Sequence, residues 1–134
     1  MRPLASEVNQ RWKTLFPARG DLRTTAYGEV TRAISGHDLP FTAFSTAESI
    51  GAAIIIRLLT AQTATGASFC WFDEPLEHLD PEVRRRVANL LSRAARGAGP
   101  LRQVVVTTYE EQLAHHLHVR DEQHVHLIDV RQTT

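Results

Sequence analysis

The spacing of apolar residues predicts a helix followed by a small β-sheet in the first third of the chain. Apolar side chains recur every three or four positions over residues 3–16, and Pro17 and Gly20 end the pattern. Residues 21–41 then hold short β-type runs, interrupted by Gly28 and by the turn-forming segment "SGHD". We expect this second segment to form a β-hairpin or a small meander.

Three further helices are predicted in the rest of the chain. Residues 46–62 carry a dense apolar run that indicates a buried helix. The tripeptide Asp-Pro-Glu that begins at Asp80 supplies an N-cap, a proline at the first helical position and an acid in the first turn. It therefore predicts a helix over residues 81–96. A short helix is expected over residues 110–118.

Three apolar segments are predicted to be strands: "SFCWF" (68–72), "QVVVTT" (103–108) and "HVHLIDV" (124–130). The first shows no alternation of apolar and polar residues, which favours a strand buried on both faces. Strands that alternate with helices along a chain predict a parallel sheet covered by those helices. We therefore expect an α/β fold in which residues 1–134 form a single domain.

Composition narrows the class of protein. The chain has 134 residues, and its 15 basic and 15 acidic side chains cancel, which removes any overall attraction to nucleic acid or anionic membrane. No apolar run approaches the roughly 20 residues that a membrane span needs. The single cysteine, Cys70, precludes an internal disulfide and fits a reducing compartment. We expect a soluble, cytoplasmic protein with no membrane partner.

Two adjacent acids, Asp73 and Glu74, directly follow the first predicted parallel strand. Binding sites in such sheets form beyond the carboxyl ends of the strands. One carboxylate at that place can hold Mg²⁺, and its neighbour can take a proton from an attacking water. The alternative is a polar strand exit followed by a proline turn. The wider pattern is more restrictive, because Pro75 and the Leu79-Asp80 pair follow at fixed distances.

Ser45 and Glu48 have the spacing of a capping box in front of the helix predicted over residues 46–62. That structural role is sufficient to explain both residues. A helix N-terminus also offers free N–H groups and the positive end of the helix dipole, so it can bind phosphate. The Ser45 hydroxyl could then contact that phosphate as well.

Four motifs follow one another along the chain: "FSTAE", "CWFDEP", "HLDP" and "VVVTTYEE". Together they resemble the C-terminal lobe of an ABC-type ATPase head, and are most similar to the structural-maintenance-of-chromosomes (SMC) and double-strand-break-repair ATPases. In that family a signature motif opens a helix, a Walker B strand ends in Asp-Glu, and a D-loop and a switch residue follow. The resemblance implies a partial P-loop-NTPase-like lobe over residues 19–134. Residues 1–18 would be a helical stub of a coiled-coil arm.

The resemblance implies roles for individual residues. Asp73 matches the Walker B acid that holds Mg²⁺, Glu74 the base that polarises the attacking water, and Asp80 the D-loop. Tyr109 takes the position of the switch histidine and is therefore a second catalytic candidate.

The signature motif of the family contacts the nucleotide that is bound to an opposing head. Ser45, Thr46 and Glu48 fall on this motif and are therefore candidate nucleotide-binding residues. ATP and Mg²⁺ are the implied ligands. A second head is the implied dimer partner, and DNA would be reached through the assembled complex.

Three departures from the family pattern bear on activity. The sequence contains no G-x-x-x-x-G-K-[ST] loop to cradle phosphates, and the family carries that loop in an N-terminal lobe, so a Walker A lobe from elsewhere is an expected partner. Thr46 and Ala47 replace the glycine pair of the signature motif, which makes close approach to a phosphate tighter. Tyr109 can donate a hydrogen bond, but it is a poorer proton carrier than histidine.

Two hypotheses for the function therefore stand. In the first, the chain is half of an ATPase head that acts in DNA repair, chromosome maintenance or defence. In the second, it is a non-catalytic remnant that serves dimerisation or protein interaction. A histidine-based metal site ranks below both, because no cysteine or carboxylate joins the five histidines of residues 115–126 at zinc spacing. The Arg84–Arg86 run is interpreted as a solvated helix face.

Overall fold

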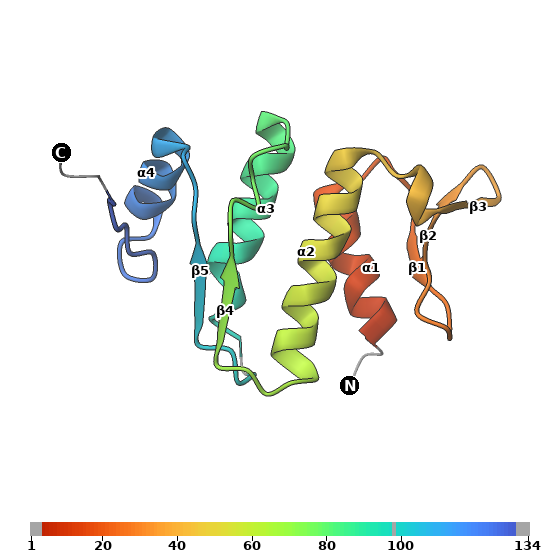
Figure 1. The fold of residues 1–134 in the computed structure, drawn as a ribbon, viewed down its shortest axis with the longest axis horizontal. Coiled ribbons are helices and arrows are strands. Elements are labelled where there is room, and N and C mark those ends of the chain that lie inside the picture. Colours follow the sequence, from red (N-terminus) through yellow and green to blue (C-terminus); the bar gives the residue numbers. More distant parts are fainter. Residues whose placement is uncertain (1–3, 98, 131–134) are drawn as a thin grey trace.

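The computed structural model describes residues 4–97 and 99–130. Its elements follow in the order α1 (Leu4–Leu15), β1 (Leu22–Thr24), β2 (Val30–Ile34), β3 (His37–Pro40), a 3-10 turn (Phe41–Ala43), α2 (Thr46–Thr63), β4 (Phe69–Phe72), α3 (Pro81–Ala94), β5 (Gln103–Val106) and α4 (Glu111–Arg120). All four predicted helices are confirmed within one or two turns of their expected bounds. The small sheet and α1 lie at one end of the molecule, β4, β5 and α4 lie at the other, and α2 and α3 stand between them (Figure 1).

The predicted meander is confirmed as a three-stranded antiparallel sheet in the order β1-β2-β3. Ile34 pairs with His37, so only Ser35 and Gly36 connect β2 to β3. Both have positive φ, at 46° and 80°, which is the backbone that a tight two-residue hairpin turn requires.

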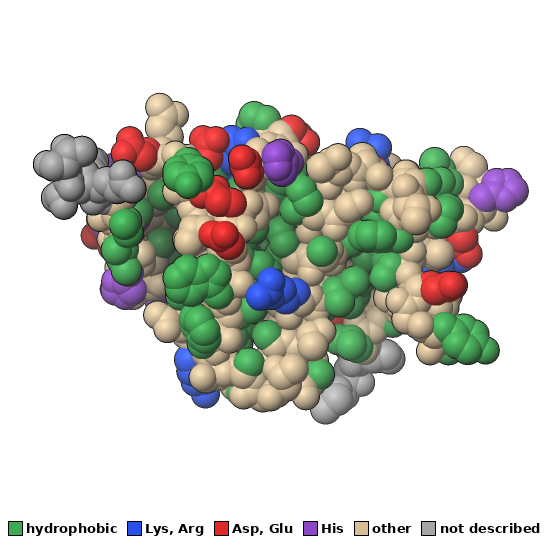
Figure 2. Space-filling view, viewed as in Figure 1, with side chains coloured by type: hydrophobic (Ala, Val, Ile, Leu, Met, Phe, Trp, Pro, Cys, Tyr) green, Lys and Arg blue, Asp and Glu red, His purple; other side chains and the backbone are tan. Residues whose placement is uncertain are grey.

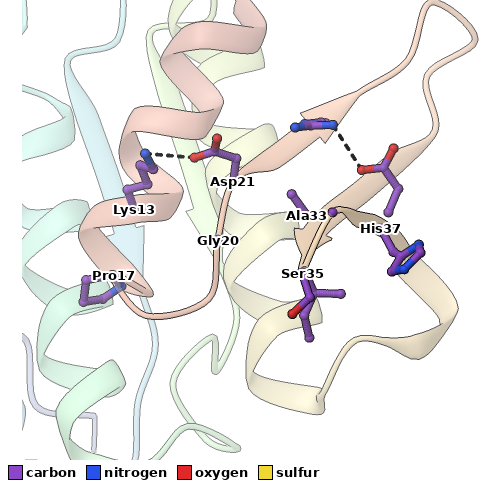
Figure 3. Close-up of a pocket in the computed structure, with 11 residues that line it drawn as sticks. Lys13, Pro17, Gly20, Asp21, Ala33, Ser35 and His37 are labelled. Atoms are coloured by element: carbon purple, nitrogen blue, oxygen red, sulfur yellow. Dashed lines mark hydrogen bonds and ion pairs between the residues drawn. The ribbon is translucent and has the colours of Figure 1, made fainter.

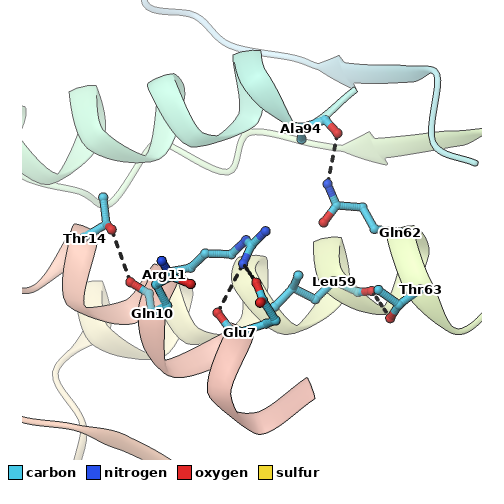
Figure 4. Close-up of polar contacts among 8 residues, drawn as sticks. All are labelled: Glu7, Gln10, Arg11, Thr14, Leu59, Gln62, Thr63 and Ala94. Atoms are coloured by element: carbon cyan, nitrogen blue, oxygen red, sulfur yellow. Dashed lines mark hydrogen bonds and ion pairs between the residues drawn. The ribbon is translucent and has the colours of Figure 1, made fainter. Parts of the chain in front are cut away.

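The core lies where α1, α2 and α3 meet the sheets. Its most deeply buried side chains are Trp12, Leu15, Ile55, Leu58, Leu59, Leu76, Leu101 and Val87. Gly51 permits the close approach of α1 and α2, because a Cβ at this position would lie only 2.6 Å from the ring of Phe16. A different contact joins α2 to α3, where the Gln62 side-chain amide donates to the carbonyl of Ala94 at 2.9 Å (Figure 4).

The strands β4 and β5 pair in parallel, with Phe69 opposite Gln103 and Phe72 opposite Val106, as the strand–helix alternation predicts. The prediction that "SFCWF" is buried on both faces is wrong. Cys70 and Phe72 are buried, whereas Phe69 and Trp71 are 50% and 48% exposed. Successive side chains of a strand point to opposite faces, and the described elements cover only the Cys70 and Phe72 face.

The strand predicted over residues 124–130 does not form, which is a second correction. These residues have no regular secondary structure, and β4 is the only ladder partner of β5 within the described chain. In the turn that follows α4, backbone N–H groups bond within the turn and not to a strand, since His124 and Val125 both donate to the carbonyl of Asp121. Over the described residues, no helix is both long enough and apolar enough to cross a membrane.

Candidate active site at the end of the parallel strands

The two predicted acids lie where the parallel strands end. Asp73 and Glu74 follow β4 directly, and Thr107 follows β5 on the neighbouring strand. The Thr107 hydroxyl donates to Oδ1 of Asp73 at 2.6 Å and accepts from the backbone N–H of Glu74 at 2.9 Å. Acidic side chains gather at this end of the molecule in Figure 2. The structure therefore joins both acids to a residue that the sequence analysis did not single out.

Glu74 has an unusual backbone. Its φ is +47°, in the left-handed region that residues other than glycine adopt only when the surrounding structure holds them there. The bond from its N–H to Thr107 is one such restraint. Strained residues of this kind cluster at active sites, so the observation supports a functional role for the turn that follows β4.

Asp80 caps α3, as its sequence context predicts. Its Oδ1 accepts from the backbone N–H groups of Glu82 and Val83, each at 3.1 Å, and Pro81 occupies the first turn. The side chain is nevertheless exposed, so its capping role leaves one edge of the carboxylate facing solvent.

Arg84 holds the loop between the acid pair and α3. Its guanidinium donates to the carbonyls of Leu76 and Leu79, at 3.3 and 2.9 Å. It also lies 3.3 Å from the carboxylate of Glu110, next to Tyr109, which is 88% exposed. Arg84 thus ties the loop before α3 to the segment that follows β5.

The interpretation of Arg84–Arg86 as a solvated helix face is correct only for Arg85, which is exposed. Arg86 donates to the carbonyl of Leu15 at 3.0 Å and so connects α3 to the end of α1. A single sequence does not reveal such contacts, because the carbonyls that accept from Arg84 and Arg86 belong to other parts of the chain.

The capping box at the start of α2 forms as predicted. The Ser45 hydroxyl accepts from the N–H of Glu48, and the Glu48 carboxylate accepts from the N–H of Ser45, both at 3.2 Å. Glu48 is only 3% exposed, and its Oε2 lies 2.8 Å from Nε of Arg32 on β2. The Glu48 carboxylate is therefore engaged inside the molecule, whereas Ser45 and Thr46 are exposed.

An open hollow of about 400 Å³ lies at the other end of the molecule, between α1 and the three-stranded sheet (Figure 3). Lys13 lies 2.8 Å from Asp21 at its rim. Hydrogen bonds from Lys13 and from Asn9 lower the pKa of the Asp21 carboxyl below its usual value. This hollow is separate from the acid pair. Four of its charged side chains already form two ion pairs, Lys13 with Asp21 and Arg23 with Asp38.

Comparison with known proteins supports the resemblance seen in the motifs. No family model matches the chain. Over 110 residues, 80% of the chain, it is 36% identical to the DNA double-strand break repair Rad50 ATPase of Methanopyrus kandleri, and this match spans 13% of that protein's length. The chain is similar to part of an SMC- and Rad50-type ABC ATPase head.

Solved SMC heads share this fold. One comes from work on ATP-driven dimerization and DNA-stimulated activation of SMC ATPases; it superposes with a TM-score of 0.65 at 20% identity over 82% of this chain and 69% of the other. The Smc head domain of Pyrococcus furiosus with an extended coiled coil, bound to the C-terminal domain of ScpA, gives 0.66 at 19% identity, over 85% and 29% of the two chains.

Within this head-like fold, the acid pair and the residues that match the signature motif lie in two separate places. Asp73 and Glu74 meet Thr107 where β4 and β5 end. Ser45 and Thr46 lie at the start of α2, and no hydrogen bond among the described residues joins them to the acid pair. Nor do the described histidines, cysteine and acids form any group of three or more that could hold a metal ion. A cation at Asp73 would therefore find fewer than three ligands among these described side chains.

Proposed function

We propose that the chain is the C-terminal half of an ABC-type ATPase head, and that it hydrolyses ATP only when a Walker A lobe from elsewhere completes it. The observation that carries this proposal is the acid pair at the end of β4, held by Thr107 from the adjacent parallel strand. The likeness to Rad50 and SMC heads supports the same function.

The surroundings of Asp73 fit a role in binding Mg²⁺. Its Oδ1 is fixed by Thr107, and among the described residues no hydrogen-bond donor reaches its Oδ2. An exposed carboxylate oxygen at a strand end is a ligand that Mg²⁺ accepts, directly or through water. When bound with ATP, Mg²⁺ neutralises charge on the phosphates.

Glu74 is proposed as the general base. Glu74 is partly buried and directly follows Asp73, and its backbone is in the left-handed region. A base in this position orients the attacking water and takes its proton. Tyr109, exposed beyond β5, takes the switch position and can donate a hydrogen bond to a phosphate.

The exposed face of β4 supports the need for another lobe. Phe69 and Trp71 lie beside each other on this face, with ring centroids 6.4 Å apart. Both β4 and β5 also keep one edge without a ladder partner in the described chain. A two-stranded sheet with an apolar open face needs further packing to be stable. We assign this face to the lobe that carries the phosphate-cradling loop.

Ser45 and Thr46 are proposed to contact a nucleotide held by a second head. Both are exposed at the N-terminus of α2, where free N–H groups favour an anion. Asp80 would lie in the same dimer interface. Glu48, which is buried, would then contribute indirectly, because its capping-box bonds with Ser45 fix the first turn of α2. Helix α1 would continue into a coiled-coil arm, and the assembled complex would act on DNA in repair or chromosome maintenance.

The test compares the chain alone with the chain fused to a Walker A lobe. Titration calorimetry should find no micromolar binding of Mg-ATP to the chain alone, because nothing in its sequence cradles the phosphates. The fusion should bind Mg-ATP and hydrolyse it. Steady turnover by the chain alone, abolished by Glu74→Gln, would show a different phosphate site and contradict the proposal.

The alternative is a non-catalytic head that keeps the fold and a dimer surface. Two departures from the family pattern favour it: Thr46 and Ala47 stand where the signature motif has glycines, and Tyr109 stands at the switch position. If this alternative holds, the fusion will bind nucleotide or dimerise without hydrolysis, and Glu74→Gln will change nothing.

A further inference from the structure

Thr107 connects the two strand ends with one hydroxyl. The proton of this hydroxyl goes to Oδ1 of Asp73, and a lone pair of the same oxygen receives the N–H of Glu74. The backbone of Thr107 also continues the strand pairing, since its own N–H donates to the carbonyl of Phe72 at 3.1 Å. One side chain therefore contacts both acids while its main chain is fixed to β4.

The two bonds constrain different parts of the acid pair. The bond to Oδ1 limits rotation of the Asp73 carboxylate, and Oδ2 has no hydrogen-bond donor among the described residues. The bond from the Glu74 N–H restrains a residue whose φ of +47° would otherwise relax towards the common regions. Only a side chain that both donates and accepts can do this, which among residues of this size means serine or threonine.

We propose that Thr107 is a positioning residue for the acid pair. Its hydroxyl sets the direction of the Asp73 carboxylate towards a cation and keeps Glu74 in the left-handed backbone that aims its carboxylate at the attacking water. This inference rests on the proposed ATPase function for its catalytic consequence, but the geometric part stands on the isolated chain alone. Partners that orient a metal-binding carboxylate typically change metal affinity or activity roughly 10- to 100-fold when they are removed.

The first experiment uses the full chain without nucleotide. Backbone amide exchange is measured by NMR in the wild type, in Thr107→Val and in Thr107→Ser. We expect the Glu74 amide to exchange faster in Thr107→Val and at nearly the wild-type rate in Thr107→Ser. Thr108→Val is the matched control, because the Thr108 hydroxyl accepts from Glu110 at 3.0 Å. Thr108→Val should speed the exchange of the Glu110 amide and leave the exchange rate of the Glu74 amide unchanged.

The second experiment uses the chain completed by a Walker A lobe. In Thr107→Val the Mg²⁺ concentration for half-maximal hydrolysis should rise roughly 10-fold or more, and Thr107→Ser should restore it. Thr107→Ala serves as a second hydroxyl-free variant if the valine variant does not fold. Glu74 exchange that is unchanged in the hydroxyl-free variants, or a Mg²⁺ dependence equal to wild type, overturns the inference. If the completed wild-type head does not hydrolyse ATP, the proposed function fails, and the exchange experiment alone then decides the positioning role.

Discussion

The side chains of Arg32 and Glu48 form an ion pair inside the molecule, with Nε and Oε2 2.8 Å apart. Arg32 lies on β2 and Glu48 in the first turn of α2, so the pair joins the small sheet to the helix that presents Ser45. Both residues are less than a tenth exposed. Arg32 also donates to the carbonyl of Arg19 at 3.0 Å, which fixes the guanidinium from a second side.

Replacing one partner of this pair should be costly. We expect Glu48→Gln to lower the free energy of unfolding by about 3–5 kcal/mol, because it leaves the Arg32 charge buried and uncompensated. Chemical denaturation measures this. The control is Arg23→Gln, which breaks the exposed pair between Arg23 and Asp38 and should cost at most about 1 kcal/mol. Equal effects at the two sites would show that the Arg32 pair is not buried in solution.

Arg84 should matter more to the loop before α3 than its exposed neighbour Arg85. Arg84→Gln removes donors to the carbonyls of Leu76 and Leu79 and should cost about 1–3 kcal/mol. Arg85→Gln should stay within about 0.5 kcal/mol of wild type. Amide exchange at Leu79, whose N–H donates to Leu76, reports the loop directly. If the Leu79 amide is equally protected in both variants, Arg84 does not hold this loop.

The open face of β4 offers a test of the missing lobe. Trp71→Ser should change the stability of the isolated chain by less than about 1 kcal/mol, because the ring is half exposed. Phe72→Ala, at a buried position of the same strand, should cost about 3–5 kcal/mol. Binding of a separately expressed Walker A lobe should weaken by at least about 10-fold in Trp71→Ser. Unchanged binding would place the lobe on another face.

Local chemistry made part of this structure predictable from the sequence. The capping box of Ser45 and Glu48 and the cap of Asp80 form between residues two or three positions apart, so the pattern is visible in the chain itself. The helix spacing of α1 and the turn at Ser35 and Gly36 are local in the same way.

Other features depend on contacts between distant segments. The apolar run of β4 does not reveal that only its Cys70 and Phe72 side is covered, because covering is decided by other elements. Thr107 acts on residues 33 and 34 positions away, and no spacing rule in the sequence signals such a bond. Residues 124–130 have the composition of a strand, but within the described chain they find no partner strand.

In the completed head, Asp73→Asn should weaken the binding of Mg-ATP itself. The substitution removes the negative charge that we propose to hold the cation while keeping the size of the side chain, so ground-state affinity should fall. Calorimetry with and without Mg²⁺ separates this from a folding defect, because nucleotide binding without Mg²⁺ should change little. If Asp73→Asn binds Mg-ATP as wild type does, Asp73 does not hold the cation.

The proposed ATPase function is tested most directly by single-turnover ATP hydrolysis in the completed head with Glu74→Gln. A general base acts in the transition state, so this variant should bind ATP nearly as wild type does. Its rate of hydrolysis should fall by a factor of roughly 10² or more. Glu77→Gln, at an exposed acid of the same loop, is the matched control and should keep the wild-type rate. Hydrolysis by Glu74→Gln at the wild-type rate would show that Glu74 is not the general base and would favour the non-catalytic head.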